Sequence, residues 1–415
     1  MIAITFVPAR RTKLALEERR TVLISGGKMT KALQLARSFH AAGHRVILAE
    51  TYKYRVTGHR FSNAVDQFVT VPEPQSPDYV AALREIVRSH GVDVYVPVCS
   101  PVSSHYDSLA IPALRDFCEI IHLAPDQIDR VDDKFRFAQA ARKKGLAAPR
   151  SFRITDPAEV EQFDFSSETR PYILKSIAYD AVRRLDLTFL PRPTAAQTSA
   201  YARSLPISPS NPWIMQEFIA GDEYCTHGTV RDGRLTVHCA CASSPFQINY
   251  AALDRPDIRN WVERFVADPP LTGQVSFDFI EADDDGQLYA IECNPRTHSA
   301  ITLFGGETGL PAAYLGHRAE RDGPLEPALG ARATYWLYHE IWRLAQAAAR
   351  GQGVLDRMRI LLHGRDAVFD WRDPLPFLML HHWHIPALLL TDLREGRGWL
   401  RIDFNIGKLV QDGGD

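Results

Sequence analysis

The first third of the chain alternates between short apolar runs and segments of helical periodicity, and its helical segments end at a glycine. Apolar runs predict strands, and apolar residues three and four apart predict helices. Strands are expected at residues 21–25, 45–50, 92–98 and 120–123, with helices at 31–42 and 79–90. Because strand–helix alternation implies right-handed crossovers, the pattern predicts an open, parallel α/β sheet over residues 20–125.

The pattern changes beyond this first unit. A helix is expected at 132–145, because acidic residues in its first turn and basic residues near its end complement the helix dipole. Strands are expected at 151–154 and 172–175 with a helix between them, and residues 204–212 form a polar, proline-rich linker.

Strand signals dominate from residue 213 to residue 292. The tight turn Arg-Asp-Gly-Arg at 231–234 lies between two strand-like runs and predicts a hairpin. A second hairpin is expected from the runs 274–281 and 287–293 around an acidic turn. Beyond residue 325 the chain becomes helical and rich in aromatic residues.

Composition narrows the class of protein. The 415 residues include 48 Lys and Arg against 50 Asp and Glu, a net charge of −2, with 45% hydrophobic residues. This balance is typical of a globular protein and argues against one whose main partner is nucleic acid, since phosphate contacts need excess positive charge.

Membrane and secretory signals are weak as well. No run of about 18 apolar residues predicts a membrane span, and the first residues lack the charge-first order of a secretory signal. The six cysteines form no CxxC pair, so we expect free thiols in a reducing cytoplasm.

The second hairpin carries the clearest chemistry. Asp278 lies on its first strand, and Glu292 and Asn294 lie two residues apart on or just after its second strand, so their side chains point to one side. Strand pairing would bring Asp278 alongside them. Two carboxylates and an amide oxygen suit Mg²⁺ that also holds nucleotide phosphates. Arg296 follows and could neutralise a transferring phosphoryl group.

The neighbours of these carboxylates favour a functional role. The segments Phe-Asp-Phe-Ile and Ile-Glu-Cys-Asn-Pro-Arg are apolar around the acidic residues, and a carboxylate in an apolar strand needs a partner. The acidic turn at 283–285 lacks that context, and a solvated loop tip accounts for it.

Five short segments then follow one another in the order found in ATP-grasp ligases. They are Asp132-Asp-Lys134, Ile173-Leu-Lys175, Gln216-Glu-Phe-Ile-Ala-Gly-Asp-Glu223-Tyr, Phe277-Asp-Phe and Ile291-Glu-Cys-Asn-Pro-Arg296. Over residues 20–310 the chain therefore resembles the ATP-grasp superfamily. The resemblance implies a mixed α/β and α+β protein with an N-terminal open α/β (pre-ATP-grasp) domain at 1–125. The ATP-grasp small subdomain would cover 126–212, the large subdomain 213–325 and a helical extension 326–415.

The resemblance also implies roles for individual residues, with ATP and Mg²⁺ as cofactors. Lys134 and Lys175 would contact the ATP phosphates. The adenine hinge would consist of Glu217, Phe218 and Ile219, and Glu223 would hold the ribose. Mg²⁺ would bind to Asp278, Glu292 and Asn294, and Arg296 would act with Lys175 in catalysis on the phosphorylated intermediate. Such a set is physically sensible, because phosphoryl transfer needs positioning and charge neutralisation.

One departure from the superfamily follows Lys175. Many ATP-grasp enzymes have a glycine-rich loop there, whereas residues 176–187 contain no glycine. Backbone cradling of phosphate is therefore not expected. Arg183 or Arg184 could supply the missing charge, or the two could form an exposed structural pair.

A narrower resemblance rests on this segment together with Asp373-Pro-Leu-Pro-Phe and Ile402-Asp-Phe-Asn-Ile-Gly-Lys408-Leu. These segments are similar to mycosporine-glycine synthetases. The resemblance implies phosphorylation of the enol of 4-deoxygadusol and displacement of phosphate by the amine of glycine. The substrates would be an amino acid and a cyclohexenone-type acceptor, and the last ~90 residues would belong to the enzyme.

Three further positions are candidates for the acceptor site. The turn at Gly26 and Gly27 could present N–H groups to an anion and by resemblance would border the acceptor, although a tight strand-to-helix turn explains it equally well. Ser100 follows a predicted strand, where open α/β sheets bind ligands. His298 could contact substrate or accept the proton of the incoming amine, or it could be structural. The histidines at 381, 382 and 384 are expected to be packing or interface residues, because their spacing does not suit a metal site.

The leading interpretation is an ATP-dependent C–N ligase that forms mycosporine-glycine, ADP and phosphate. A carboxylate–amine ligase acting through an acyl phosphate, or a non-catalytic nucleotide-binding protein, are the alternatives. The expected partners are small molecules, without nucleic acid or membrane. The sequence leaves the oligomeric state open, a homodimer included.

Overall fold

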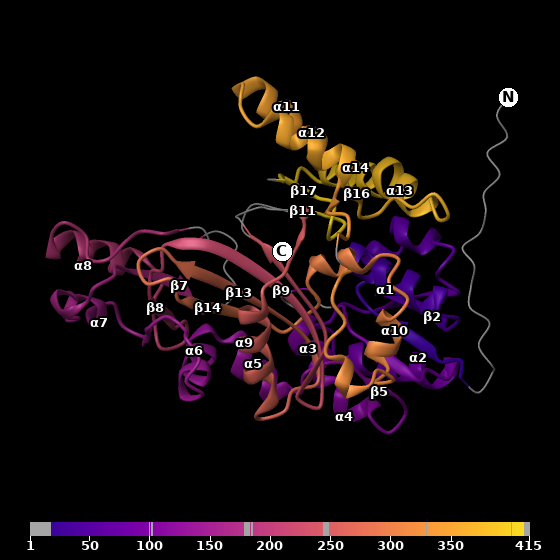
Figure 1. Ribbon diagram of the computed structural model, residues 1–415, viewed down its shortest axis with the longest axis horizontal. Helices are drawn as coiled ribbons and strands as arrows, with labels where there is room; N and C mark the ends of the chain where they lie inside the picture. Colours follow the sequence, from indigo (N-terminus) through magenta and orange to yellow (C-terminus); the bar gives the residue numbers. More distant parts are fainter. Residues whose placement is uncertain are drawn as a thin grey trace.

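The computed structural model describes residues 18–98, 100, 103–177, 183, 186–243, 249–328, 330–399 and 401–410 (Figure 1). Within these residues the chain forms a parallel α/β unit, two antiparallel sheets and a C-terminal extension that packs on the α/β unit.

The first unit is a five-stranded sheet in the order β3-β2-β1-β4-β5, with every pairing parallel. Its strands are β1 (Thr21–Ile24), β2 (Arg45–Thr51), β3 (Gln67–Val71), β4 (Val94–Val96) and β5 (Glu119–Ile120), and its main connecting helices are α1 (Thr30–Ala41) and α2 (Tyr79–His90). The predicted open α/β sheet is confirmed. The edge strand β3 was not predicted, because its central residues are only half-buried and mixed in polarity.

Alternation along β1 explains how the sheet is covered. Val22 and Ile24 pack in one core with the apolar face of α1, whereas Leu23 packs in another with Leu83 and Val87 of α2. Successive residues of a strand point to opposite faces, so one short strand fills two cores. The carboxyl ends of β1 and β4 are neighbours in this sheet.

The predicted helix at 132–145 is wrong at its start. The structure has two helices, α5 (Pro125–Asp132) and α6 (Lys134–Lys143). Asp133 has extended backbone angles, and its carboxylate accepts hydrogen bonds from the N–H groups of Phe135 and Arg136. This N-cap starts a new helix, because it satisfies two amide groups that have no partner inside the helix.

A small antiparallel sheet follows in the order β6-β8-β7. It consists of β6 (Ser151–Ile154), β7 (Tyr172–Ser176) and β8 (Trp213–Glu217), with α7 (Pro157–Glu161) and α8 (Ala195–Ser204) beside it. The predicted strands and intervening helix are confirmed. The predicted linker at 204–212 begins with the last residue of α8 and includes a bridge between Ser208 and Asn211.

The largest antiparallel sheet has the order β12-β10-β9-β13-β14. Its strands are β9 (Gly221–Arg231), β10 (Arg234–Ala242), β12 (Ala252–Leu253), β13 (Gly273–Ala282) and β14 (Leu288–Asn294), and α9 (Pro256–Ala267) packs against it. Both predicted hairpins are confirmed. Asp232 and Gly233 have positive φ angles of 49° and 77°, as a two-residue hairpin turn requires.

The C-terminal extension contains helices, as predicted, and also short strands. After η4 (Ser299–Phe304) and α10 (Leu310–Tyr314), its elements are β15 (Thr334–Tyr335), α11 (Leu337–Arg350), α12 (Val354–His363), β16 (Arg365–Asp366), α13 (Leu375–Met379), the π-helix η6 (Leu380–His384), α14 (Ile385–Arg394), β17 (Arg401–Asp403) and β18 (Lys408–Val410). Arg37 of α1 pairs with Asp373 at 2.9 Å, and the indole of Trp336 donates to Thr30, so the extension is fastened to α1.

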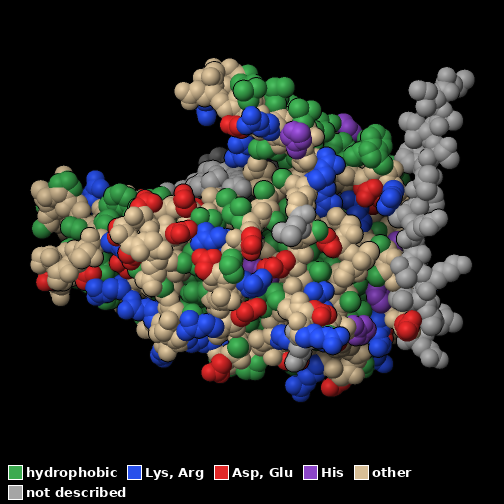
Figure 2. Space-filling model, viewed as in Figure 1, with side chains coloured by type: hydrophobic (Ala, Val, Ile, Leu, Met, Phe, Trp, Pro, Cys, Tyr) green, Lys and Arg blue, Asp and Glu red, His purple; other side chains and the backbone are tan. Residues whose placement is uncertain are grey.

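Within the described residues, no helix combines the length and the apolar character needed to cross a membrane. Figure 2 shows many hydrophobic side chains on the surface of the extension, over α11 to α14 at the top of the view.

Candidate functional site

The carboxylates predicted to bind Mg²⁺ lie opposite each other in the β13–β14 hairpin. Asp278 is the register partner of Glu292, and a β-bulge follows Asp278. The amide nitrogen of Asn294 donates to one oxygen of each carboxylate, at 3.2 Å in both cases. The structure therefore brings the three side chains together on one face of the sheet, and bulges are frequent beside such sites.

Electrostatics make the carboxylate pair unequal. Burial, together with the nearby charge of Glu292, raises the pKa of Asp278 well above its ordinary value. Burial acts on Glu292 in the same direction, but Lys134, the hydrogen bond from Asp278 and Lys175 outweigh it and hold the pKa of Glu292 well below its usual range. Asp278 therefore binds its proton more tightly than Glu292 does.

Three cations surround this pair. Lys134 is the first residue of α6, and its Nζ lies 3.5 Å from Glu292. Lys175 lies on β7, where burial lowers its pKa against the attraction of Glu292. Arg296 donates to the side-chain oxygen of Asn294. The site thus combines adjacent carboxylates with three positive groups, all from different elements or turns.

The donor set fits a divalent cation. Carboxylate and amide oxygens are the ligands that Mg²⁺ prefers. Burial and the charge of Glu292 oppose the ionisation of Asp278, and a bound cation would favour it. Asp278, Glu292 and Asn294 are the residues that would hold it. In the described residues no group of three His, Cys, Asp or Glu side chains is placed to hold a metal ion, and the third oxygen donor in this set is an amide.

The predicted adenine hinge follows β8 and is engaged with its surroundings. Glu217 accepts a hydrogen bond from the N–H of Arg150 at 3.0 Å and pairs with Arg170 at 3.4 Å. The N–H of Phe218 donates to the carbonyl of Pro171 at 2.8 Å. Ile219 is buried. These contacts order the segment, and its role toward adenine stays a prediction.

The remaining residues predicted to bind ATP are exposed or lie outside the described part. Glu223 is exposed on β9. Burial lowers the pKa of Lys175, and the negative charge of Glu223 partly opposes this effect. Arg183 is exposed. Arg184 lies outside the described residues, as does most of the glycine-free segment around it.

The turn after β1 is explained by the fold. Gly26 has a φ of +69°, and a Cβ there would lie 2.1 Å from the carbonyl oxygen of Val98. The N–H of Gly27 donates to Ala49 at 3.0 Å, and the next N–H donates to Glu50. Because these amides already have partners, the geometry favours the tight-turn interpretation over an anion site.

Ser100 caps helix α3 (Ser103–Leu109), and the start of this helix contacts the segment that precedes Arg296. Ser100 exchanges side-chain to backbone hydrogen bonds with Ser103, the first residue of α3. Ser104 then donates to the carbonyl of Pro295 at 2.8 Å, directly before Arg296. The start of α3, which follows β4 in the chain, therefore lies beside the candidate site.

His298 has contacts typical of a structural residue. Burial, then the charges of Lys31 and Arg296, lowers its pKa to about 3. Its Nδ1 accepts from the N–H of Ala300 at 3.2 Å, and its ring packs edge-on against Tyr250. An effective general base has a pKa near the working pH, so this geometry lends no weight to the predicted base role.

Sequence reasoning missed two residues that tie distant segments to the site. Lys31 on α1 donates to the carbonyl of Thr297 at 2.7 Å, next to Arg296. Asn405 donates to Ser299 at 2.6 Å, and its carbonyl accepts from the N–H of Thr30 at 2.8 Å. The only signal for Asn405 was the resemblance of the segment that contains it, and nothing singled out Lys31.

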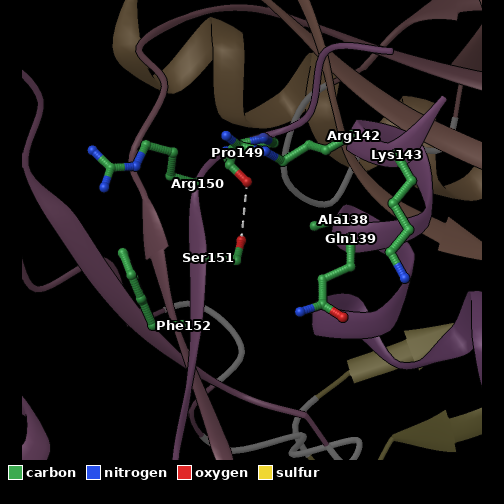
Figure 3. Close-up of a pocket in the computed structure, with 8 residues that line it drawn as sticks. All are labelled: Ala138, Gln139, Arg142, Lys143, Pro149, Arg150, Ser151 and Phe152. Atoms are coloured by element: carbon green, nitrogen blue, oxygen red, sulfur yellow. Dashed lines mark hydrogen bonds between the residues drawn. The ribbon is translucent and has the colours of Figure 1, made fainter. Parts of the chain in front are cut away.

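Two cavities lie elsewhere. The first cavity has a volume of about 460 Å³ and lies between α6 and β6. Figure 3 shows Arg142 and Lys143 on one side of this cavity and Phe152 on the other. A larger one, of about 1520 Å³, lies between α1 and the C-terminal extension and is lined by residues such as Arg37 and Arg365. Neither is lined by the carboxylate pair or its cations.

Comparison with known proteins identifies the fold. No family model matches the chain. The chain is 21% identical over 234 residues to the C-terminal section of the carbamoyl phosphate synthase large chain of Methanopyrus kandleri. The match covers 51% of this chain and 41% of that protein, so the chain spans about two fifths of its relative's length.

Solved structures give the same result. The biotin carboxylase domain of a single-chain bacterial carboxylase superposes with a TM-score of 0.55 at 16% identity, over 74% of this chain and 70% of that one. The biotin carboxylase domain of the Hydrogenobacter thermophilus 2-oxoglutarate carboxylase, solved with MgADP and bicarbonate, gives 0.52 at 13% identity, over 68% and 65%. These likenesses confirm the predicted ATP-grasp fold.

Proposed function

We propose that this protein of ATP-grasp fold is an ATP- and Mg²⁺-dependent ligase that joins the amine of an amino acid to an acceptor activated by phosphorylation. The observation that carries the proposal is the pairing of Asp278 with Glu292, bridged by Asn294 and ringed by Lys134, Lys175 and Arg296. Carboxylates that hold a cation and cations that hold phosphate are the two requirements of phosphoryl transfer.

ATP and Mg²⁺ are the cofactors of this proposal. The solved neighbour that contains MgADP has the same fold and supports that assignment. Mg²⁺ supplies charge neutralisation when it is bound, and Lys134 and Lys175 add to it from α6 and β7. Glu217, Phe218, Ile219 and Glu223 are proposed to hold the nucleoside.

The first chemical step is phosphorylation of the acceptor. An enol oxygen of the acceptor attacks the γ-phosphorus and loses its proton to solvent, the bond to the bridging oxygen of ADP breaks, and ADP leaves with that electron pair. Lys175 and Arg296 stabilise the negative charge that spreads over the phosphoryl oxygens. Removing one such contact costs about 3 kcal/mol of transition-state stabilisation, so each cation is expected to matter.

The second step forms the C–N bond. The neutral amine attacks the carbon that bears the phosphate, inorganic phosphate leaves with its oxygen, and the nitrogen loses a proton. Arg296 holds the departing phosphate. The pKa of His298 is lowered to about 3, so this side chain is a weak base. The leaving phosphate or solvent is therefore the better acceptor for the proton of the amine.

We further propose glycine and 4-deoxygadusol as substrates and mycosporine-glycine as the product. The resemblance of residues 176–187, 373–377 and 402–409 to mycosporine-glycine synthetases motivates this choice. The contacts of Asn405 with Ser299 and Thr30 are consistent with an extension that belongs to the enzyme.

The test is a reaction with purified protein. With ATP, MgCl₂, glycine and 4-deoxygadusol we expect ADP release that depends on both substrates, together with a new ultraviolet-absorbing product. Absence of both signals, in protein that binds nucleotide in a thermal-shift assay, would refute the proposed substrates.

A carboxylate–amine ligase acting through an acyl phosphate is the second candidate. The similarity to a carbamoyl phosphate synthase over half of the chain supports this candidate. The residues proposed to hold ATP and Mg²⁺ would serve either acceptor. A panel of carboxylates and amines, followed by ADP release, separates the two. Nucleotide binding without turnover on any acceptor would instead indicate a non-catalytic protein.

A further inference from the structure

The C-terminal extension exposes stripes of large apolar side chains on successive helices. On α11, Tyr338, Ile341 and Trp342 are 37%, 45% and 62% exposed, and their spacing of three and four residues places them on one face. On α12, Leu355 and Leu362 are 69% and 70% exposed on one face as well. Comparable side chains continue over α13, η6 and α14, and Figure 2 shows them gathered along one edge of the molecule.

The helices α11 and α12 bury almost nothing in the single chain. Glu340 is the one buried residue of α11, and α12 has none. The two helices are joined by an ion pair between Arg357 and Glu340 at 2.9 Å. Tyr338 packs against Phe377 and His381, but most apolar side chains of the two helices stay exposed. Helices in proteins are stabilised mainly by packing an apolar face, so a second surface that covers these side chains would stabilise both helices.

The size of this surface distinguishes it from ordinary scattered exposure. Twelve of the nineteen large hydrophobic residues that are exposed in the described chain lie between Tyr338 and Leu393. At roughly 200 Å² per large side chain, the exposed fractions of those on α11, α12 and α14 alone amount to roughly 900 Å². The largest apolar patch of a typical monomer is about 300–600 Å², and each partner in a standard protein interface contributes about 800 Å².

The composition of the surface points to a protein partner. Six of these twelve side chains are Leu and three are Trp, and such a strongly apolar surface is typical of a homodimer interface. A helix that binds anionic lipid instead has a strongly basic polar face. Here exposed charges of both signs pair locally, as Arg359 does with Asp356 and Arg397 with Glu395.

We propose that the exposed face of α11, α12 and α14 is the interface of a homodimer formed by a second copy of this chain. The area matches what a stable dimer needs, and the locally paired charges allow the surface to meet itself across a two-fold axis without strong repulsion. The proposal does not depend on the proposed function.

The dimer also bears on the site. The same extension holds Asn405 against Ser299 and Thr30 on its other side, and Trp336, directly before α11, donates to Thr30. Covering α11 and α12 therefore stabilises the segment that carries these contacts.

Sedimentation velocity of the full-length protein at micromolar concentration tests the proposal. We expect a species of about 93 kDa, twice the 46.7 kDa of the chain, and its conversion to the monomer on dilution. Trp342→Glu and Leu362→Glu each place a charge in the interface and should weaken the dimer at least about 30-fold. Phe117→Glu, at a site 44% exposed on the α/β unit, is the matched control and should leave the dimer unchanged.

Each other outcome overturns the proposal. A wild-type chain that is monomeric throughout this range has no such dimer. If both variants remain dimeric while circular dichroism shows them folded, the dimer uses another surface. Co-sedimentation of the wild-type monomer with vesicles of phosphatidylserine and phosphatidylcholine, lost in Trp342→Glu, would assign the face to a membrane.

Discussion

The two ends of the β13–β14 hairpin carry the same residue types and behave in opposite ways. In the strands, Asp278 and Glu292 are register partners, and burial raises the pKa of Asp278. At the tip, Asp284 and Asp285 are exposed, and hydrogen bonds from Arg170 and from the N–H of Gln287 respectively lower their pKa values. Carboxylates that the fold places close together and partly out of water are suited to bind a cation. Carboxylates on an exposed turn stay hydrated and form a charged surface.

The largest expected effect is the loss of turnover in Glu292→Gln. The substitution keeps the shape of the side chain but removes the charge proposed to hold Mg²⁺, so activity should fall by about 10²-fold or more. Asp284→Asn is the matched control at the tip and should stay within about twofold, since it touches no proposed substrate group. ADP release is the measurement. Activity that survives in Glu292→Gln would show that the metal-site assignment is wrong.

The next effect concerns the cations on the strand side. Lys175→Met should lower kcat/KM for ATP by about 10²-fold, because it removes one of the three cations proposed to hold the transferring phosphoryl group. Lys143→Met, at the exposed end of α6, is the control and should be close to wild type. Equal losses in both variants would mean that general surface charge, and not the position of Lys175, governs the rate.

A smaller effect is expected in the pH dependence of stability without Mg²⁺. The folded-state pKa of Asp278 is raised, so its contribution to stability is present below the ordinary pKa of Asp and is lost as the pH rises through the raised value. Asp278→Asn cannot ionise and should therefore raise the Tm of the Mg²⁺-free protein at pH 8 by about 2 °C. Added Mg²⁺ should stabilise the wild type and have much less effect on the variant.

Thermal unfolding across pH 5 to 9, with and without MgCl₂, measures this difference. A Tm difference between wild type and Asp278→Asn that does not change with pH would show that Asp278 does not ionise over this interval. The measurement is independent of catalysis, so it separates the metal site from the choice of acceptor.

The hairpin was predictable because its information is local. The Asp-Gly turns and the two-residue spacing of Glu292 and Asn294 determine which side chains share a face, and the register then brings Asp278 opposite. In the same way, the strands and helices of the α/β sheet followed from apolar periodicity. Asp133 was harder, because a capping residue and a first-turn acid look alike in sequence, and only the backbone angle shows that a new helix begins.

Long-range contacts were not predictable from such patterns. Lys31 and Thr297 are 266 residues apart, and nothing in the periodicity of α1 distinguishes Lys31 from a surface lysine. Asn405 reaches the site by a similar route. The roles of Lys134 and Lys175 came from resemblance, since a single lysine has no local signature. The unpartnered face of the extension was not predicted either, because an amphipathic helix looks the same in sequence whether its partner is its own chain or another.

The smallest expected effect returns to the hairpin tip. Arg170 donates to Asp284 at 2.7 Å and to Asp285 at 2.9 Å, and it also pairs with Glu217 in the predicted hinge. The tip partners of Arg170 are exposed, and ion pairs with exposed carboxylates contribute little, so Arg170→Gln should lower the Tm by no more than about 2 °C and leave kcat unchanged. Because Arg170 orders Glu217, KM for ATP is the one kinetic value that should rise, by about twofold to fivefold. Asp284→Asn breaks the tip contact but leaves the hinge contact, and it should leave KM unchanged. If Asp284→Asn raised KM for ATP as much as Arg170→Gln does, the hairpin tip would influence ATP binding. The proposed contrast between a catalytic carboxylate pair in the strands and a purely structural turn would then be wrong.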